Sequence, residues 1–343
     1  MQLTTIGLDL AKQVFQIHGV DATGSVVVRR RLRRAEVLRI FSATEPCLVG
    51  MEACATAHYW ARELVALGHR VKLVPPAYVK PYVKRGKTDA ADAEAICEAV
   101  TRPTMRYVPI KSAEQQAALM LYRSRDLLVR QRTMLAHAIR GHFAEFGIVA
   151  PQGIGRIGEL AALLLDDSTA NLPVVMRQTL TTLIGQLQGL GDRVAALEAQ
   201  IVAAHRQNEK SRRLASTPGV GPITASALVA SVSDARQFKS ARHFAAWLGL
   251  TPRSHSSGGK DRPGGISKEG DPYLRRLLVT GATCVIRHAR TKAPGEAGWL
   301  KALLARRPAR LVSVALANNM ARIVWVLLTR DEVHAPPSIR AAV

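Results

Sequence analysis

The stretch Leu3-Thr4-Thr5-Ile6-Gly7-Leu8-Asp9 is a short run of β-prone residues, and two more such runs follow it at residues 14–20 and 25–31. The connections between the runs are tight and include Asp21 and Gly24. Short strands joined in this way are typical of an antiparallel meander. The sequence therefore predicts three consecutive antiparallel strands at the start of the chain.

The next segments alternate between helix and strand patterns. A helix is predicted over residues 34–43, a strand over 47–51, a helix over 57–67 and a strand over 70–74, which Pro75-Pro76 ends. A meander followed by this alternation predicts an α/β domain with a mixed sheet and the strand order of a ribonuclease-H-like fold.

Four acidic residues occupy informative places on that fold. Asp9 ends the first strand and Glu52 ends the strand over 47–51. Asp89 and Asp92 are three residues apart at the start of a predicted helix that runs to about residue 100, so they share one helix face. Converging carboxylates repel one another unless a cation neutralises them, and Mg²⁺ prefers carboxylates with water and phosphate oxygens. We therefore predict an Mg²⁺ or Mn²⁺ site of the kind that assists phosphodiester displacement.

A purely structural interpretation of the same carboxylates also exists. Asp89 would cap the helix, Asp92 would complement the helix dipole, and Asp9 and Glu52 would be ordinary strand ends. Each carboxylate taken singly is explained in this way. The combination of all four in a basic chain is what favours the metal site.

The middle of the chain is predicted to form one helix over residues 112–147 and a second long helix that carries an apolar seam. Apolar residues there alternate steps of three and four over three heptads, the pattern of a coiled coil: Leu180, Leu183, Leu187, Leu190, Val194, Leu197 and Ile201. Gly185, Gly189 and Gly191 weaken this helix by ~1 kcal/mol each relative to Ala, so it needs a partner. That partner is either the 112–147 helix or a second chain, and residues 150–173 are predicted to be a loop.

Charge is the strongest compositional signal. The 343 residues include 48 Lys and Arg against 26 Asp and Glu, a net charge of +22. Residues 205–343 alone hold 23 basic and 8 acidic side chains. This excess indicates a polyanionic partner, most simply nucleic acid, and argues against an enzyme that acts only on small molecules.

A glycine-containing hairpin at Pro218-Gly219-Val220-Gly221-Pro222 precedes a helix to about residue 232. Free backbone N–H groups of Gly219 and Gly221 could contact a phosphate, as in a helix-hairpin-helix motif. A tight turn between packed helices would use the same glycines. Further helices over 271–289 and 310–329 are predicted to pack as the core of a mainly α-helical C-terminal part.

Residues 251–265 form a polar loop rich in glycine and serine, with Arg253, Lys260 and Arg262 as phosphate-binding candidates. A serine becomes a nucleophile when its surroundings activate it, and basic neighbours can stabilise an attacked phosphate. From the residues alone, a flexible linker or a phosphate clamp is the favoured interpretation of the loop over a catalytic serine, and His255 is a weak candidate for a base.

The sequence also bears on the compartment. Its four cysteines include no Cys-x-x-Cys pair, Asp9 and Lys12 interrupt any signal peptide, and the longest uncharged stretch, 215–233, contains two prolines. We expect a soluble, cytoplasmic protein without a membrane segment.

Five motifs occur in one order along the chain: Ile6-Gly7-Leu8-Asp9-Leu10-Ala11-Lys12, Glu52-Ala53-Cys54, Lys87-Thr88-Asp89-Ala90-Ala91-Asp92-Ala93, Pro218-Gly219-Val220-Gly221, and Gly249-Leu250-Thr251-Pro252 with Ser256-Ser257-Gly258-Gly259-Lys260. In this order they resemble the DEDD insertion-sequence transposases of the IS110 family, and more closely its IS1111 subgroup. The resemblance covers residues 6 to 328.

The resemblance implies three domains: a RuvC-like catalytic domain over 1–104, a helical coiled-coil segment over 105–210 and a C-terminal transposase domain over 211–343. It implies that the DEDD metal ligands are Asp9, Glu52, Asp89 and Asp92, and that the catalytic serine is Ser257, with Ser256 as the alternative. It also implies a covalent serine–DNA intermediate, and a noncoding guide RNA that pairs with donor and target DNA.

Three functions are consistent with these features. The first is a DNA recombinase that uses the acidic cluster and Ser257 and works as a homo-oligomer, a dimer or tetramer. The second is a structure-selective Mg²⁺-dependent nuclease that resembles Holliday-junction resolvases. The third is a nucleic-acid-binding protein without catalysis.

Overall fold

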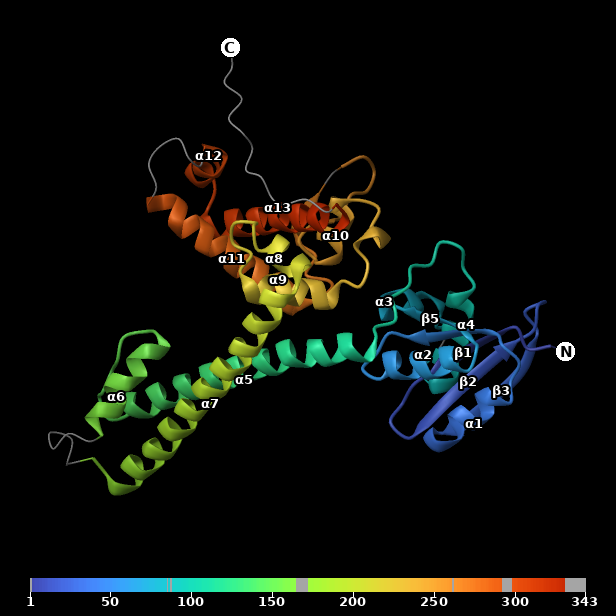
Figure 1. The fold of residues 1–343 in the computed structure, drawn as a ribbon, viewed down its shortest axis with the longest axis horizontal. Helices are drawn as coiled ribbons and strands as arrows, with labels where there is room; N and C mark the ends of the chain where they lie inside the picture. The colour runs from blue at the N-terminus through green and yellow to red at the C-terminus, as the bar shows by residue number, and fades with distance from the viewer. Residues whose placement is uncertain are drawn as a thin grey trace, which may run out of the picture. The chain divides into compact units, whose positions relative to one another are not determined.

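The computed structural model describes residues 2–84, 86, 88–164, 172–260, 262–291 and 298–330. The chain divides into two compact units, residues 1–116 and 117–343. Each unit is described by itself below, with the element labels of Figure 1.

The first unit is built on a five-stranded mixed sheet. Its strands and main helices are β1 (Thr5–Asp9), β2 (Val14–Val20), β3 (Val26–Arg33), α1 (Val37–Ser42), β4 (Leu48–Glu52), α2 (Ala57–Ala66), β5 (Arg70–Val74), α3 (Pro76–Val79) and α4 (Asp89–Val100). The strand order is β3-β2-β1-β4-β5, with β1, β2 and β3 antiparallel and with β4 and β5 parallel to β1. The predicted meander, alternation and mixed sheet are confirmed, and this order is consistent with a ribonuclease-H-like fold.

Side chains alternate between the two faces of this sheet, as they must in extended strands. Ile6, Leu8 and Met51 are fully or almost fully buried on the face that packs with α1 and α2. The opposite face receives α4, and glycines permit the close approach. A Cβ on Gly7 would lie 2.1 Å from the Ala93 carbonyl oxygen of α4, and one on Gly50 would meet Val100 at 2.8 Å.

Two long helices, α5 (Ala113–Ala144) and α7 (Val174–Gln207), form the first part of the second unit, which begins at Ala117 within α5. They pair in antiparallel fashion. Ile139 and Phe143 of α5 belong to the same buried cluster as Leu180 and Ile184 of α7. Further along the pair, Arg125 Nε donates to Glu198 Oε1 over 2.8 Å.

The pairing of α5 with α7 decides between the two partners predicted for the α7 seam, a helix of the same chain or a second chain. Five of the seven apolar residues of the α7 seam are buried inside the chain, namely Leu180, Leu187, Leu190, Val194 and Ile201, while Leu183 and Leu197 are partly exposed. The internal hairpin is therefore the alternative that the structure supports, and an intermolecular coiled coil is not shown. The predicted loop over 150–173 is partly wrong, because it contains the helix α6 (Ile157–Leu163), whose Ile157 and Leu160 join the hairpin core.

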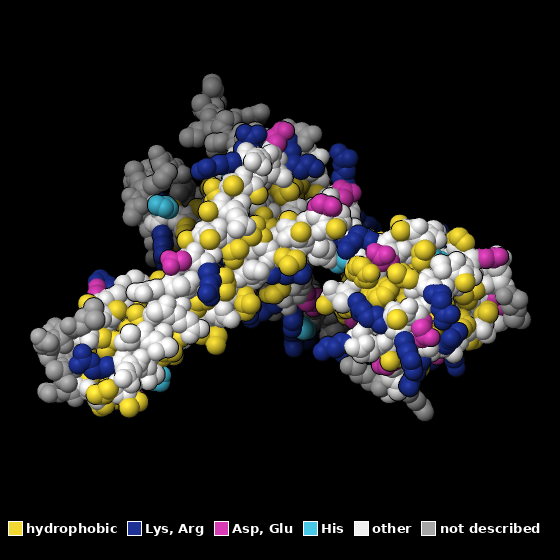
Figure 2. All heavy atoms as spheres, turned by 60° about the horizontal axis from the view of Figure 1, so that its bottom comes forward, with side chains coloured by type: hydrophobic (Ala, Val, Ile, Leu, Met, Phe, Trp, Pro, Cys, Tyr) yellow, Lys and Arg dark blue, Asp and Glu magenta, His cyan; other side chains and the backbone are white. Residues whose placement is uncertain are grey.

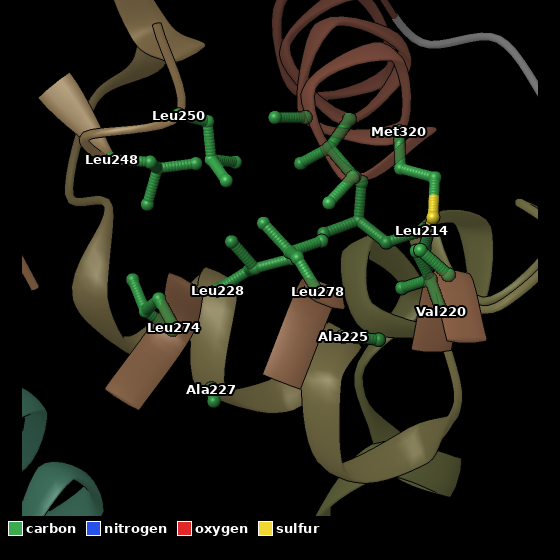
Figure 3. Close-up of a cluster of buried hydrophobic side chains, with 14 of the residues drawn as sticks. Leu214, Val220, Ala225, Ala227, Leu228, Leu248, Leu250, Leu274, Leu278 and Met320 are labelled. Atoms are coloured by element: carbon green, nitrogen blue, oxygen red, sulfur yellow. The ribbon is translucent and has the colours of Figure 1, made fainter. Parts of the chain in front are cut away.

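The C-terminal part is helical, as predicted. It consists of α8 (Glu209–Leu214), α9 (Pro222–Ser231), α10 (Ala241–Trp247), α11 (Pro272–Thr291), α12 (Gly298–Arg306) and α13 (Ala309–Thr329), with a two-stranded sheet of β6 (Pro252–Ser254) and β7 (Pro263–Ile266). Figure 3 shows part of its core, where Leu228, Leu278 and Met320 come together from three different helices. The helix α12 was not foreseen from the sequence.

Helix α13 is long and apolar enough, by composition, to cross a membrane. In this unit 44% of that stretch is buried, and its residues Val312, Ala317 and Val324 are fully covered by neighbouring helices. The helix therefore serves as part of the core, as the sequence predicted for residues 310–329.

Candidate active site

Asp9 and Glu52 end two neighbouring parallel strands. Leu8 of β1 is paired with Met51 of β4, so the next residue on each strand is one of the two acids. Asp9 shares its face with Gly7, and Glu52 shares its face with Gly50, because each is two residues further along its strand. Both acids therefore belong to the face that α4 covers.

Helix α4 runs antiparallel to β1 and brings its first turn to the same end of the sheet. Cys97 Sγ lies 3.9 Å from the Thr5 carbonyl oxygen, and Gly7 faces Ala93 one turn earlier in the helix. Continuing in this direction, the first turn of α4 with Asp89 and Asp92 reaches the level of Asp9. The turn is fixed by Thr88, whose Oγ1 accepts from the Ala91 N–H over 3.2 Å.

The pKa of Asp9 reflects the proximity of the other three carboxylates. Burial, followed by the negative charges of Asp92, Asp89 and Glu52, raises the pKa of Asp9 to about 6. A hydrogen bond from the Leu10 backbone opposes this shift. Three carboxylates from two other elements therefore lie within interaction range of the fourth, which is how a cation-binding carboxylate set behaves.

The side chains approach one another without closing into a ligand shell. Among the residues that the structure describes, no three His, Cys, Asp or Glu side chains converge closely enough to hold one ion. The donor set still fits a hard divalent cation, since it consists of carboxylate oxygens at the edge of a sheet. Lys87, which belongs to the same motif, lies outside the described residues.

Ser257 lies in the second unit, on a hairpin that the sequence suggested only as a loop. Ser257 and Lys260 form an isolated antiparallel bridge, and the Lys260 N–H donates to the Ser257 carbonyl over 3.1 Å. Gly258 and Gly259 between them have φ of 57° and 75°. Two positive φ values mark a type I′ turn, so Gly-Gly was the available signal for the hairpin. Ser257 is exposed beside this turn.

The neighbours of Ser257 are arranged as follows. Ser254 Oγ and Ser256 Oγ are 2.9 Å apart. The Arg253 guanidinium donates to the Ser267 carbonyl over 2.8 Å and thereby braces the hairpin. Lys260 and Arg262 are exposed, while Asp261 lies outside the described residues. The hairpin therefore presents Ser257 together with two exposed cations.

Gly219 and Gly221 have different surroundings. A Cβ on Gly281 of α11 would lie 2.0 Å from the Gly219 carbonyl oxygen, so Gly219 is a close-packing position with φ of 85°. Gly221 is the exposed N-cap of α9 and has nothing within 4 Å of an added Cβ. The tight turn between packed helices therefore accounts for Gly219. The phosphate-contact alternative remains for Gly221, which lies at the exposed N-terminal end of α9.

Family models match both the region that contains the four acids and the region that contains the serine hairpin. Residues 6–148 match a family model described as a DEDD transposase of the IS110 type, and residues 211–295 match the transposase IS116/IS110/IS902 family. The first match spans the four acids, and the second spans the serine hairpin.

Full-length relatives give the same result. The chain is 54% identical to a probable family 20 transposase of Pseudomonas aeruginosa, over 98% of this chain and 100% of the relative. It is 50% identical to a putative transposase of Sinorhizobium fredii, over 97% and 86%. It is 41% identical to the transposase for insertion sequence element IS1111A of Coxiella burnetii, over 96% and 90%. The chain therefore belongs to the IS110/IS1111 family of DEDD transposases, enzymes that cleave and join DNA.

Proposed function

We propose that this transposase cleaves and rejoins DNA with two groups of its own residues, a cation site at Asp9, Glu52, Asp89 and Asp92 and a nucleophile at Ser257. The observation that carries the proposal is the gathering of three further carboxylates around Asp9, which raises its pKa to about 6. Repulsion among these carboxylates destabilises the folded protein unless the cluster binds a cation.

The carboxylates would hold Mg²⁺ or Mn²⁺. When bound, the cation would stabilise charge on the oxygens of the phosphate under attack. Asp9 and Glu52 are fixed by neighbouring strands, and Asp89 and Asp92 by a capped helix turn. A frame of this kind holds its ligands in place before DNA arrives.

The test of the cation site needs no DNA. Calorimetric titration of the full chain with Mn²⁺ should show binding that Asp9→Asn weakens by at least about tenfold. Glu45→Gln, which alters an exposed carboxylate of the same unit, is the control and should bind like wild type. Equal binding by Asp9→Asn would reject the site.

In the proposed reaction, the Ser257 hydroxyl oxygen attacks a DNA phosphorus and its proton passes to solvent. The phosphorus–oxygen bond to one sugar breaks, and that sugar leaves as a free hydroxyl. The reverse attack by a hydroxyl of the new partner strand restores a phosphodiester and frees the serine. The exposed hairpin leaves Ser257 accessible to DNA, and Lys260 and Arg262 supply positive charge beside it.

The covalent step can be trapped. A nicked DNA substrate should leave an adduct that peptide mapping locates on Ser257, and Ser257→Ala should abolish it. Ser254→Ala is the matched control on the same hairpin and should retain the adduct. An adduct on Ser256 would move the nucleophile by one residue, and an adduct on a tyrosine would refute serine catalysis.

We also propose that a noncoding RNA from the same element guides the enzyme by pairing with donor and target DNA. The support is the net charge of +22, which provides affinity for nucleic-acid backbones but little base specificity, together with the resemblance of the motifs to this family. RNA guidance would assign sequence choice to base pairing.

Its test is to purify the protein from cells that carry the whole element and to sequence the bound RNA. Changing the target-complementary bases of that RNA should redirect insertion to sites that match the new bases. Insertion at the old sites, or normal recombination by nuclease-treated protein, would refute RNA guidance.

We propose, finally, that the active form is a homo-oligomer. Because the α7 seam is used internally, the support comes from α5, where Met120, Leu127 and Met134 follow one another at steps of seven and are 65%, 47% and 70% exposed. Light scattering with nucleic acid bound should give a multiple of the chain mass of 37.2 kDa, and Leu127→Glu should reduce it. A monomer mass for the wild type would refute the proposal.

A further inference from the structure

The outer strand β3 carries an unusual density of arginines. Within Val26–Arg33 three consecutive positions, Arg29, Arg30 and Arg31, are arginine, and all three are exposed. β3 is an edge strand, and charged side chains on an edge block unwanted strand pairing. If blocking strand pairing were their only role, arginines on the two faces of β3 would serve it equally well.

The sheet register makes them different. Asp9 is paired with Gln16, and Gln16 is paired with Arg31, so these three residues form one row across β1, β2 and β3 on a single face. Arg30 is paired with Ile17, which is buried in the core of the opposite face. Arg31 therefore shares the face of the acidic cluster, while Arg30 does not.

The separation along this row leaves room for a DNA backbone phosphate between the acidic cluster and Arg31. Neighbouring strands are about 4.8 Å apart, which puts the Asp9 and Arg31 backbones on the order of 10 Å from each other. Gln16 between them is neutral and buried, and its amide is turned to the Ile17 carbonyl. An aspartate, a phosphate and an extended arginine together span such a distance.

Arg31 is the arginine of that face that lies in the row of Asp9. Arg29, one row back, is engaged with Glu94 of α4 at 3.3 Å, and Lys84 binds the same carboxylate at 2.7 Å. Within the part of the chain that the structure describes, no ion pair or side-chain hydrogen bond engages Arg31. Its charge is therefore free for a ligand from outside the unit. Figure 2 shows Lys and Arg side chains spread over this N-terminal unit, at the right of the view.

We propose that Arg31 contacts a DNA backbone phosphate next to the phosphodiester held at the acidic cluster, and so positions the strand for cleavage. This inference rests on the proposed function of the four carboxylates. Arginine suits the task because its planar guanidinium donates two parallel hydrogen bonds to phosphate oxygens. It also offsets the repulsion between the phosphates and the carboxylates of the site.

The first test compares three variants of the full chain, expressed together with the flanking noncoding region of the element. At saturating DNA, Arg31→Ala should slow strand cleavage by about tenfold to a hundredfold, the effect of one charge-assisted hydrogen bond. Arg31→Lys should recover part of the rate. Arg30→Ala removes the same charge from the opposite face and should stay within about twofold of wild type.

The second test asks which phosphate Arg31 contacts. Substrates with a single neutral methylphosphonate at successive positions beside the cleaved bond should include one that slows the wild type and leaves Arg31→Ala unaffected. Thermal unfolding of Arg31→Ala and Arg30→Ala should agree, since both positions are exposed. If Arg31→Ala lost no more activity than Arg30→Ala, or if every methylphosphonate slowed both proteins equally, the inference would be overturned.

The tests also separate this inference from the function on which it rests. Cleavage at the wild-type rate by Asp9→Asn would refute the acidic site itself. An inactive Asp9→Asn alongside a fully active Arg31→Ala would refute only the role of Arg31.

Discussion

The acidic cluster and the serine hairpin differ in how the chain holds them. The four carboxylates come from two adjacent strands and one capped helix that are packed around glycines. Ser257 stands beside a two-residue turn on a small exposed two-stranded sheet. A site that gathers like charges needs a rigid frame, whereas a nucleophile that must meet DNA needs accessibility. Substitutions in the acidic cluster and in the serine hairpin test this contrast.

The largest expected effect comes from the charge of the cluster itself. Asp9→Asn keeps the size of the side chain but removes the central carboxylate, and we expect DNA cleavage to fall by at least about a hundredfold in limiting Mg²⁺. Cleavage of an element-end substrate measures this effect, with Glu45→Gln as the control carboxylate. Unchanged cleavage by Asp9→Asn would remove the cluster from the reaction.

The contact between α4 and β1, which holds the acidic cluster in place, can be disrupted without substituting any of the four acidic residues. Gly7→Ala would place a Cβ 2.1 Å from the Ala93 carbonyl oxygen and force α4 away from β1. We expect a loss of about 1–3 kcal/mol in the free energy of unfolding, together with a fall in cleavage. Chemical denaturation of the full chain measures the first quantity.

The control for this substitution is Gly185→Ala in α7, where an added Cβ meets nothing within 4 Å. It should stabilise the helix by up to ~1 kcal/mol. Equal effects of the two substitutions would show that the contact between α4 and β1 is not tight.

The hairpin should respond in the opposite manner, through activity more than through stability. Gly258→Ala forces an L-residue into φ of 57°, at a cost of roughly 1–2 kcal/mol that falls on the turn alone. We expect formation of the serine–DNA adduct to drop several-fold while the main unfolding transition stays in place. Gly265→Ala on the same hairpin has no positive φ and open space, and it should form the adduct at the wild-type rate.

The last prediction concerns the pH dependence of stability. Because the folded pKa of Asp9 is raised from 3.8 to about 6, the folded state holds its proton more tightly than the unfolded chain does. The resulting stabilisation is complete below pH 3.8 and is lost as the pH rises to about 6. In EDTA, Asp9→Asn should therefore unfold at a higher temperature than wild type at pH 7.5. The two should unfold at the same temperature near pH 4, and a wild type that is more stable at pH 7.5 would contradict the argument.

Predictions from the sequence were accurate where local pattern decides structure. Short β-prone and apolar runs predicted β1, β2 and β4 to within about two residues, and the helix from Asp89 to Val100 agrees at both ends. The loop over 150–173 concealed α6, because its glycines and prolines outweighed a short apolar run. The serine loop concealed a hairpin, because its many glycines, serines and basic residues favoured an irregular loop and outweighed the turn signal of Gly258-Gly259.

By itself, the sequence determined the mixed sheet, the helical remainder, the positions of the four acids at strand and helix ends, and the excess of positive charge. These features depend on residue type and on spacing along the chain, which need no long-range contact. Tertiary structure alone decided the partner of the α7 seam, since apolar residues at heptad spacing pack equally well against a helix of the same chain or of another. It also decided the direction of α4 over β1 and the row that joins Asp9, Gln16 and Arg31. Both follow from pairing between segments distant in sequence, and a shift of one residue in that pairing would move Arg31 to the other face of the sheet.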